Sequence, residues 1–276
     1  MKFVYVLLGL LILLCSVESA RSDIYIEFGK KKPCGYSATG CQDSTGWNGN
    51  YALAGDIFVG TCKVSYLIEY YEKFCPSTDP FLSTYSCQIV GMYILSKTNC
   101  NLSYQEILGI IYLRIWNNVF KENNVENIVC NVNMAGCMTK AESLENTYLK
   151  YEKNAPMPAR GSAGSAQLDS IFKNGPVQIY AALVACESTR ECCISHYKVK
   201  YDTDMKQIVH AEKIGQSFPE DSAACDSAKS EFGTCTDGCQ YSNLEFKYDL
   251  MRGSELPSTN NQAIAYPNPT DGNVKF

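Results

Sequence analysis

The chain has 276 residues and a net charge of −5, from 24 Lys and Arg against 29 Asp and Glu. It contains no basic run, so the sequence gives no electrostatic support to nucleic-acid binding. Its fifteen cysteines are typical of a protein that works in an oxidising compartment, where disulfides persist.

The N-terminus has the form of a secretory signal peptide. Lys2 provides a positive start, and residues 3–15 form an apolar run. This run is too short for a transmembrane helix, which needs about 20 residues. A signal-peptide cleavage site follows a small residue, any residue and another small residue. Val17 and Ser19 fit these two small-residue positions, so we predict cleavage after Ser19. Residues 1–19 are therefore assigned to the signal peptide.

Removal of Cys15 with the signal peptide leaves fourteen of the fifteen cysteines. An even number in an exported chain predicts up to seven disulfides. Each stabilises the fold by about 2–4 kcal/mol, mainly by restricting the unfolded chain. Cys192 and Cys193 are adjacent, so we expect them to bond to different partners. The spacing of the cysteines along the chain does not determine how the others pair.

Residues 20–153 are predicted to form a cysteine-rich α+β region. Alternating or β-rich segments favour strands at residues 23–28 and 51–59. Residues 62–71 favour a strand but also fit a helical period. Residues 87–96 form a short apolar element that the pattern leaves open between the two.

Two capping boxes predict helices in the same region. Ser103 and Glu106 form the first, in which each side chain satisfies a backbone N–H group at the helix start. Apolar residues follow at helical spacing, namely Ile107, Ile110, Ile111, Ile115 and Phe120. Thr139 and Glu142 form the second box, which predicts a helix ending near residue 153.

A linker at residues 154–164, rich in Pro, Gly and Ala, separates this region from a second one at residues 165–254. There we predict a short helix at 167–173 and an antiparallel sheet. Its strands are expected at residues 177–184, 194–201, 207–214 and 244–250, with a hairpin turn at 202–204. The predicted fold class is α+β: disulfide-rich, with an antiparallel sheet and a few helices.

The two histidines of the chain, His196 and His210, both lie in the predicted hairpin. Such a pair could bind metal or serve catalysis, but without a fixed acidic or thiol companion the pattern favours ordinary sheet positions. Cys235 and Cys239 have a spacing that zinc sites use, yet no second ligand pair is near, which favours disulfides. We therefore assign no catalytic, cofactor-binding or metal-binding residue.

Residues 171–177 resemble a stretch of the papain-like cysteine peptidases that precedes the catalytic histidine. The resemblance implies that His210 would be the general base. That family's nucleophilic cysteine stands beside a tryptophan, whereas Cys34 is followed by Gly-Tyr-Ser and Trp47 is far from any cysteine. Because the match fails at the nucleophile, we predict that His210 is structural, with a papain-like peptidase or other secreted hydrolase as the alternative function.

The C-terminus, residues 255–276, begins as a polar linker and continues with Tyr-Pro-Asn-Pro-Thr-Asp-Gly at residues 266–272. Two prolines, a turn and the alternating Val274 and Phe276 follow one another. This pattern resembles the start of the C-terminal sorting domain of the type IX secretion system of Bacteroidota. The resemblance implies transport through that machinery to the cell surface or the medium.

Together these patterns predict an exported, disulfide-stabilised protein that is type IX secretion cargo and acts as a surface or interaction protein. The expected partner is the type IX machinery, through the C-terminal tail. The sequence specifies no ligand and no cofactor.

Overall fold

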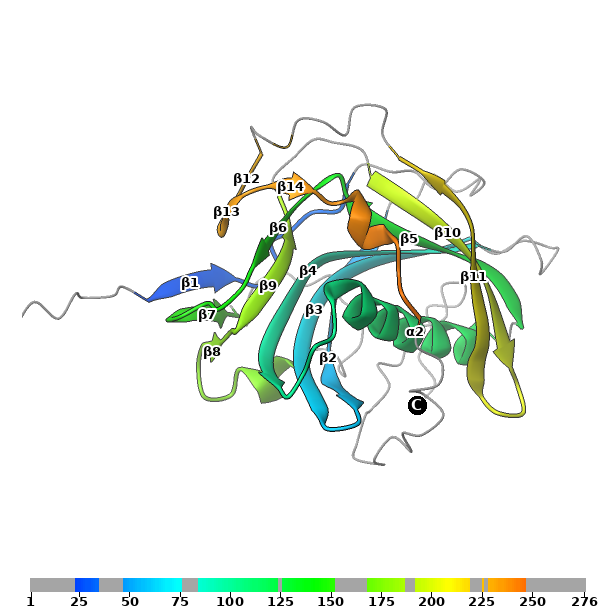
Figure 1. The fold of residues 1–276 in the computed structure, drawn as a ribbon, viewed down its shortest axis with the longest axis horizontal. Helices are drawn as coiled ribbons and strands as arrows, with labels where there is room; N and C mark the ends of the chain where they lie inside the picture. The colour runs from blue at the N-terminus through cyan, green and yellow to red at the C-terminus, as the bar shows by residue number, and fades with distance from the viewer. Residues whose placement is uncertain are drawn as a thin grey trace, which may run out of the picture.

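A curled nine-stranded sheet dominates the molecule (Figure 1). The computed structural model describes residues 23–34, 47–75, 84–123, 126–151, 168–186, 192–218, 225 and 228–246. The predicted signal peptide, the linker at 154–164 and the sorting tail lie outside these residues. One path through the sheet runs β11 (Gln207–Ser217), β10 (Cys192–Asp202), β5 (Asn127–Ala135), β4 (Thr84–Thr98), β9 (Ala181–Ala185), β6 (Cys137–Ala141) and β14 (Thr236–Asp237).

Strand β4 is the junction of the sheet. On one side it pairs along its length with β3 (Cys62–Cys75), which in turn pairs with the edge strand β2 (Asn48–Val59). On its other side it pairs with β5 at residues 84–88, in parallel, and with β9 at residues 91–94, antiparallel. The sheet therefore divides into a β5–β10–β11 branch and a β9–β6–β14 branch.

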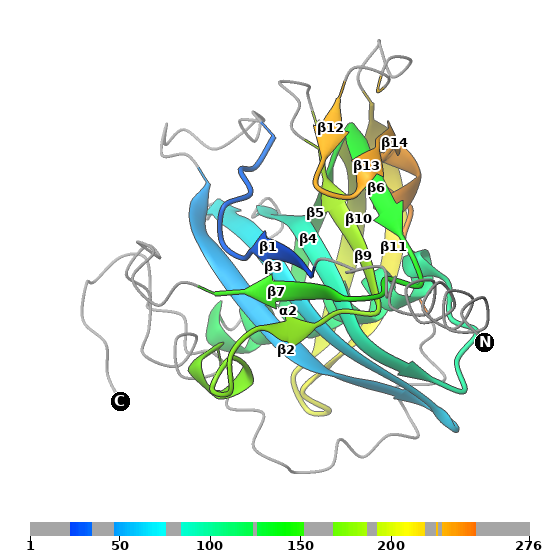
Figure 2. The ribbon, with the colours of Figure 1, turned by 90° about the vertical axis from the view of Figure 1, so that its left-hand side faces the viewer.

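A small three-stranded sheet packs on one face of the large sheet (Figure 2). Its strands are β1 (Ile24–Glu27), β7 (Thr147–Lys150) and β8 (Val177–Gln178), with β1 and β7 parallel. Ile26 and Leu149 point into a buried cluster with Leu67 and Tyr93 of the large sheet. A separate two-stranded hairpin is formed by β12 (Lys229–Ser230) and β13 (Gly233–Thr234).

The opposite face of the large sheet is covered by α2 (Tyr104–Asn123), which connects β4 to its parallel neighbour β5. The predicted capping box is confirmed. The backbone N–H of Ser103 donates to Glu106 Oε2 at 2.7 Å, and the N–H of Glu106 donates to Ser103 Oγ at 3.2 Å. Trp116 is completely buried in the main core between helix and sheet.

A C-terminal strap, residues 239–246, packs against α2. It consists of the 3-10 helix η2 (Cys239–Ser242) and four further residues. The Tyr197 hydroxyl donates to Ser242 O at 3.0 Å and accepts from the Leu244 N–H at 2.9 Å. Phe246 packs on Trp116 and Tyr197. Residues 244–246 do not form a strand. The prediction of a strand at 244–250 is therefore wrong for these three residues.

The predicted α+β class is wrong, because the protein is predominantly β. The main local error is the second capping box: Thr139 lies in β6, and β7 occupies residues 147–150, where a helix was expected. The predicted hairpin is present as β10 and β11. The large sheet interleaves strands from both sides of the 154–164 linker, since β4 pairs with β9 and β5 pairs with β10.

Candidate functional site

Disulfides connect the body of the protein, as the sequence predicts. The five described pairs have Cα–Cα distances of 4.5–6.3 Å: Cys34–Cys192, Cys62–Cys100, Cys137–Cys225, Cys186–Cys235 and Cys193–Cys239. Cys75 is also disulfide-bonded. The adjacent Cys192 and Cys193 do have different partners, Cys34 and Cys239, and so tie the start of β10 both to the N-terminal segment and to the strap.

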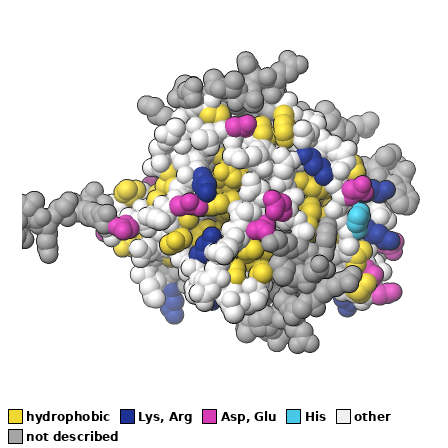
Figure 3. Space-filling model, in the orientation of Figure 1, with side chains coloured by type: hydrophobic (Ala, Val, Ile, Leu, Met, Phe, Trp, Pro, Cys, Tyr) yellow, Lys and Arg dark blue, Asp and Glu magenta, His cyan; other side chains and the backbone are white. Residues whose placement is uncertain are grey.

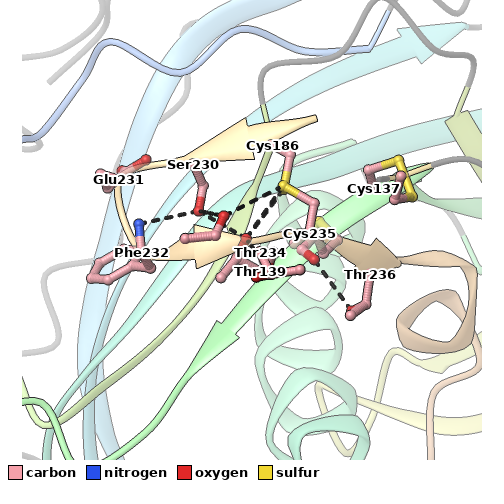
Figure 4. Close-up of a disulfide and its surroundings, with 12 residues drawn as sticks. Cys137, Thr139, Cys186, Ser230, Glu231, Phe232, Thr234, Cys235 and Thr236 are labelled. Carbon is pink, nitrogen blue, oxygen red and sulfur yellow. Dashed lines mark hydrogen bonds between the residues drawn. A yellow bond between two sulfur atoms is a disulfide. The ribbon is translucent and has the colours of Figure 1, made fainter. Parts of the chain in front are cut away.

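The Cys186–Cys235 disulfide lies beside a small hydrogen-bond network (Figure 4). Thr139 is its centre: its hydroxyl accepts a hydrogen bond from Ser230 Oγ at 2.8 Å and donates to Thr234 O at 3.1 Å. Thr139 Oγ1 also lies 3.2 Å from Cys186 Sγ. The threonine that the sequence suggested as a helix cap therefore connects β6 to the β12–β13 hairpin.

Among the described cysteines, Cys87 and Cys130 are the two free thiols, and both are completely buried. Burial is the main cause that raises the pKa of each thiol well above its ordinary value, and the charge of Glu72 raises that of Cys87 further. A nucleophilic cysteine needs the reverse, a lowered pKa and access to solvent. Both thiols are therefore core residues.

The papain-like interpretation fails at both of its key residues. Cys34, the cysteine considered as nucleophile, is bonded to Cys192. His210, the considered base, is exposed on β11, where its Nε2 lies 3.6 Å from Glu212 Oε2. Opposite it in the sheet stands Lys200. The zinc interpretation of Cys235 and Cys239 also fails, because the two belong to different disulfides.

Asp237 lies close to Cys193 and Cys239, with the ligand atoms of all three within 4.8 Å. The two sulfurs are bonded to each other. A disulfide sulfur is not the thiolate that binds metal, so this group is not a metal site.

His196 is the histidine with structured polar partners. Its Nδ1 lies 2.8 Å from Asn131 Oδ1 on β5, and its Nε2 lies 3.4 Å from Ser217 Oγ at the end of β11. Asn131 in turn donates from Nδ2 to Ser86 Oγ at 3.0 Å. Burial lowers the pKa of the His196 imidazole. Sequence patterns did not indicate Asn131 or Ser217, because only strand register brings them to this histidine.

A stacked pair of tyrosines lies on the small sheet. Tyr25 is 53% exposed and stacks on Tyr148 with ring centroids 5.9 Å apart. We call the stacked pair Tyr25 and Tyr148 the tyrosine surface. On the face seen in Figure 3, Lys and Arg side chains are scattered among acidic ones and do not form a patch.

No family model, curated protein or solved structure matches this chain. Among the described residues, no helix has the length and apolar character needed to cross a membrane.

Proposed function

We propose that this chain is an exported, disulfide-stabilised protein that travels by the type IX route and acts as a surface or interaction protein. The observation that carries the proposal is the disulfide network. Eleven described cysteines are disulfide-bonded, and bonds of this number persist only where thiols are not kept reduced. The signal-like N-terminus and the sorting-like C-terminus support export independently of the fold.

The network also suits a protein that must stay folded outside the cell. Cys34–Cys192 joins residues 158 positions apart, and Cys137–Cys225 joins residues 88 positions apart. Long closed loops restrict the unfolded chain most, so such bonds stabilise the fold where no chaperone assists it.

The tyrosine surface is the region that we propose for partner contact. Tyrosines offer large, rigid, amphipathic contact area and are enriched at protein interfaces. Tyr25 and Tyr148 belong to strands held by the small sheet, so their stacked rings are already ordered before a partner binds. This preorganisation lowers the entropic cost of association.

Export is tested by expressing the gene in a Bacteroidota strain with an intact type IX system and in one that lacks the translocon. We expect the protein at the surface or in the medium of the first strain and in the periplasm of the second. Equal distribution in both strains would refute the type IX route. Retention of residues 1–19 on the cytoplasmic protein would refute export itself.

Partner contact is tested with purified protein added to cells that lack the gene, followed by washing and antibody detection. The variant Tyr25→Ser with Tyr148→Ser should lose most of the retained protein. Phe58→Ser is the matched control, because Phe58 is exposed on β2, outside the small sheet. Equal retention of both variants would show that the tyrosine surface is not the contact.

A further inference from the structure

Three polar side chains on neighbouring strands, Asn131, His196 and Ser217, contact one another in a row. Asn131 on β5 is directly opposite His196 on β10, and Ser217 on β11 is its diagonal neighbour, since Gly215 pairs with His196. Side chains that alternate along paired strands point to the same face at these positions. The register thus places an amide, an imidazole and a hydroxyl in one row.

The row fixes which imidazole nitrogen carries the hydrogen. Asn131 donates from Nδ2 to Ser86, which leaves its Oδ1 as the acceptor for His196 Nδ1 at 2.8 Å. Nδ1 is then the protonated nitrogen, and the lone pair of Nε2 faces Ser217 Oγ at 3.4 Å. Partial burial lowers the pKa of His196, which keeps the ring neutral and able to accept a proton.

Exposure increases along the row in the order that catalysis requires. Asn131 is 6% exposed, His196 is half-buried and Ser217 is exposed. β11 is an edge strand of the large sheet, and Gly215 has no side chain to cover the imidazole that it faces. A reactant can therefore reach Ser217 while the base and the group that orients it stay fixed by the sheet.

We propose that Ser217, His196 and Asn131 form an acyl-transfer site that hydrolyses small carboxylic esters. Ser217 is the nucleophile, His196 the general base and Asn131 a positioning residue that orients the imidazole. A nucleophile within reach of a base that a third group orients is the general signature of such sites. The site is separate from the tyrosine surface and independent of the proposed export function.

The reaction balances with water as the co-reactant. Ser217 Oγ attacks the ester carbonyl carbon while its proton passes to His196 Nε2, and the alcohol leaves with that proton. Water then attacks the acyl-serine and gives one proton to Nε2. The carboxylic acid departs as the Oγ–acyl bond breaks, and the proton returns to Ser217. The net change is ester plus water to acid plus alcohol.

The chemistry of the leaving group favours esters over amides as the substrate class. An alkoxide or phenoxide leaves more readily than an amine, so an ester needs less assistance from an acid at the leaving group. The open edge of β11 also suits a short acyl group that does not require a deep cavity. Activated phenyl esters are therefore the first substrates to try.

The experiment is labelling with a fluorophosphonate, in which the Ser217 Oγ–P bond forms, fluoride leaves and the serine proton passes to His196. We expect covalent label at Ser217 by peptide mass spectrometry and hydrolysis of 4-nitrophenyl acetate. Ser217→Ala should abolish both. Ser96→Ala is the matched control, since Ser96 is exposed and hydrogen-bonded to Ser65 rather than to a histidine, and it should label like wild type.

Two further variants distinguish catalysis from a structural role. His196→Gln should slow labelling by about 100-fold or more, the lower end of what a general base contributes. Asn131→Ala should slow it too, while Asn131→Asp should restore it, because a carboxylate also accepts from Nδ1–H. Absence of label on folded wild type, or labelling that His196→Gln leaves unchanged, overturns the proposal.

Discussion

Replacing Gly109 with alanine tests the packing of the C-terminal strap on α2. A Cβ built at Gly109 would lie 2.3 Å from the carbonyl oxygen of Glu245. That oxygen belongs to the backbone, so the strap must move by about 1 Å to reach an ordinary contact distance. Overpacking of this kind costs about 1–3 kcal/mol.

A second effect has the opposite sign. Alanine is favoured over glycine inside a helix by about 1 kcal/mol, and Gly109 lies in the first half of α2. If the strap were not packed there, Gly109→Ala would stabilise the protein by that amount. With the strap in place we expect a net loss of stability of up to about 2 kcal/mol, the overpacking cost less the helix gain.

Urea denaturation gives the stability change, and amide hydrogen exchange locates it. The Leu244 N–H donates to the Tyr197 hydroxyl, so in the variant it should exchange faster than in wild type, while amides in the middle of β4 stay protected. Lys121→Ala is the control, since Lys121 is exposed in the last turn of α2 and its replacement should change stability by less than about 0.5 kcal/mol. A stabilised Gly109→Ala protein with unchanged exchange at Leu244 would refute the described packing.

Three other changes have defined outcomes. Ser103→Ala removes the helix cap and should lower the free energy of unfolding by about 0.5–2 kcal/mol, measured by urea denaturation; an unchanged value would contradict the capping box. Tyr197→Phe deletes both hydrogen bonds to the strap and should cost about 1–3 kcal/mol, because the buried Ser242 carbonyl and the partly buried Leu244 N–H lose their partner, with thermal unfolding as the readout. Burial lowers the pKa of His196 in the folded protein. As the pH falls, this imidazole is therefore protonated at a higher pH in the unfolded state than in the folded state. Wild type should therefore lose more stability than His196→Gln between about pH 7 and pH 5, and parallel stability curves for the two would contradict the burial of this ring.

The two capping boxes show what the sequence could and could not predict. Ser103 and Glu106 are followed by apolar residues at helical spacing, so local and tertiary preferences agree and the helix forms. Thr139 and Glu142 have the same pattern, but the next residues include Ser143 and Asn146, both with φ of 52°. Strand pairing of Thr139 with Val184 then decides the structure. Long-range pairing of this kind leaves no local signal.

The candidate site was hidden for the same reason. His196 was visible as a histidine in a hairpin, but its partners come from β5, which the sequence analysis did not predict, and from the last residue of β11. Ser217 is 21 positions and Asn131 is 65 positions from His196. By contrast, the oxidised state of the cysteines followed from their number and the signal-like N-terminus, since cross-linking depends on compartment more than on fold.

A disulfide map of the native protein tests the account most directly. The protein is recovered from the cells that produce it, free thiols are blocked in denaturant without a reductant, and the peptides are identified by mass spectrometry. We predict the linkages Cys34–Cys192, Cys62–Cys100, Cys137–Cys225, Cys186–Cys235 and Cys193–Cys239, with blocked thiols at Cys87 and Cys130. Blocked thiols at the linked positions would contradict an exported, disulfide-stabilised protein, and a bond to Cys87 or Cys130 would contradict the fold.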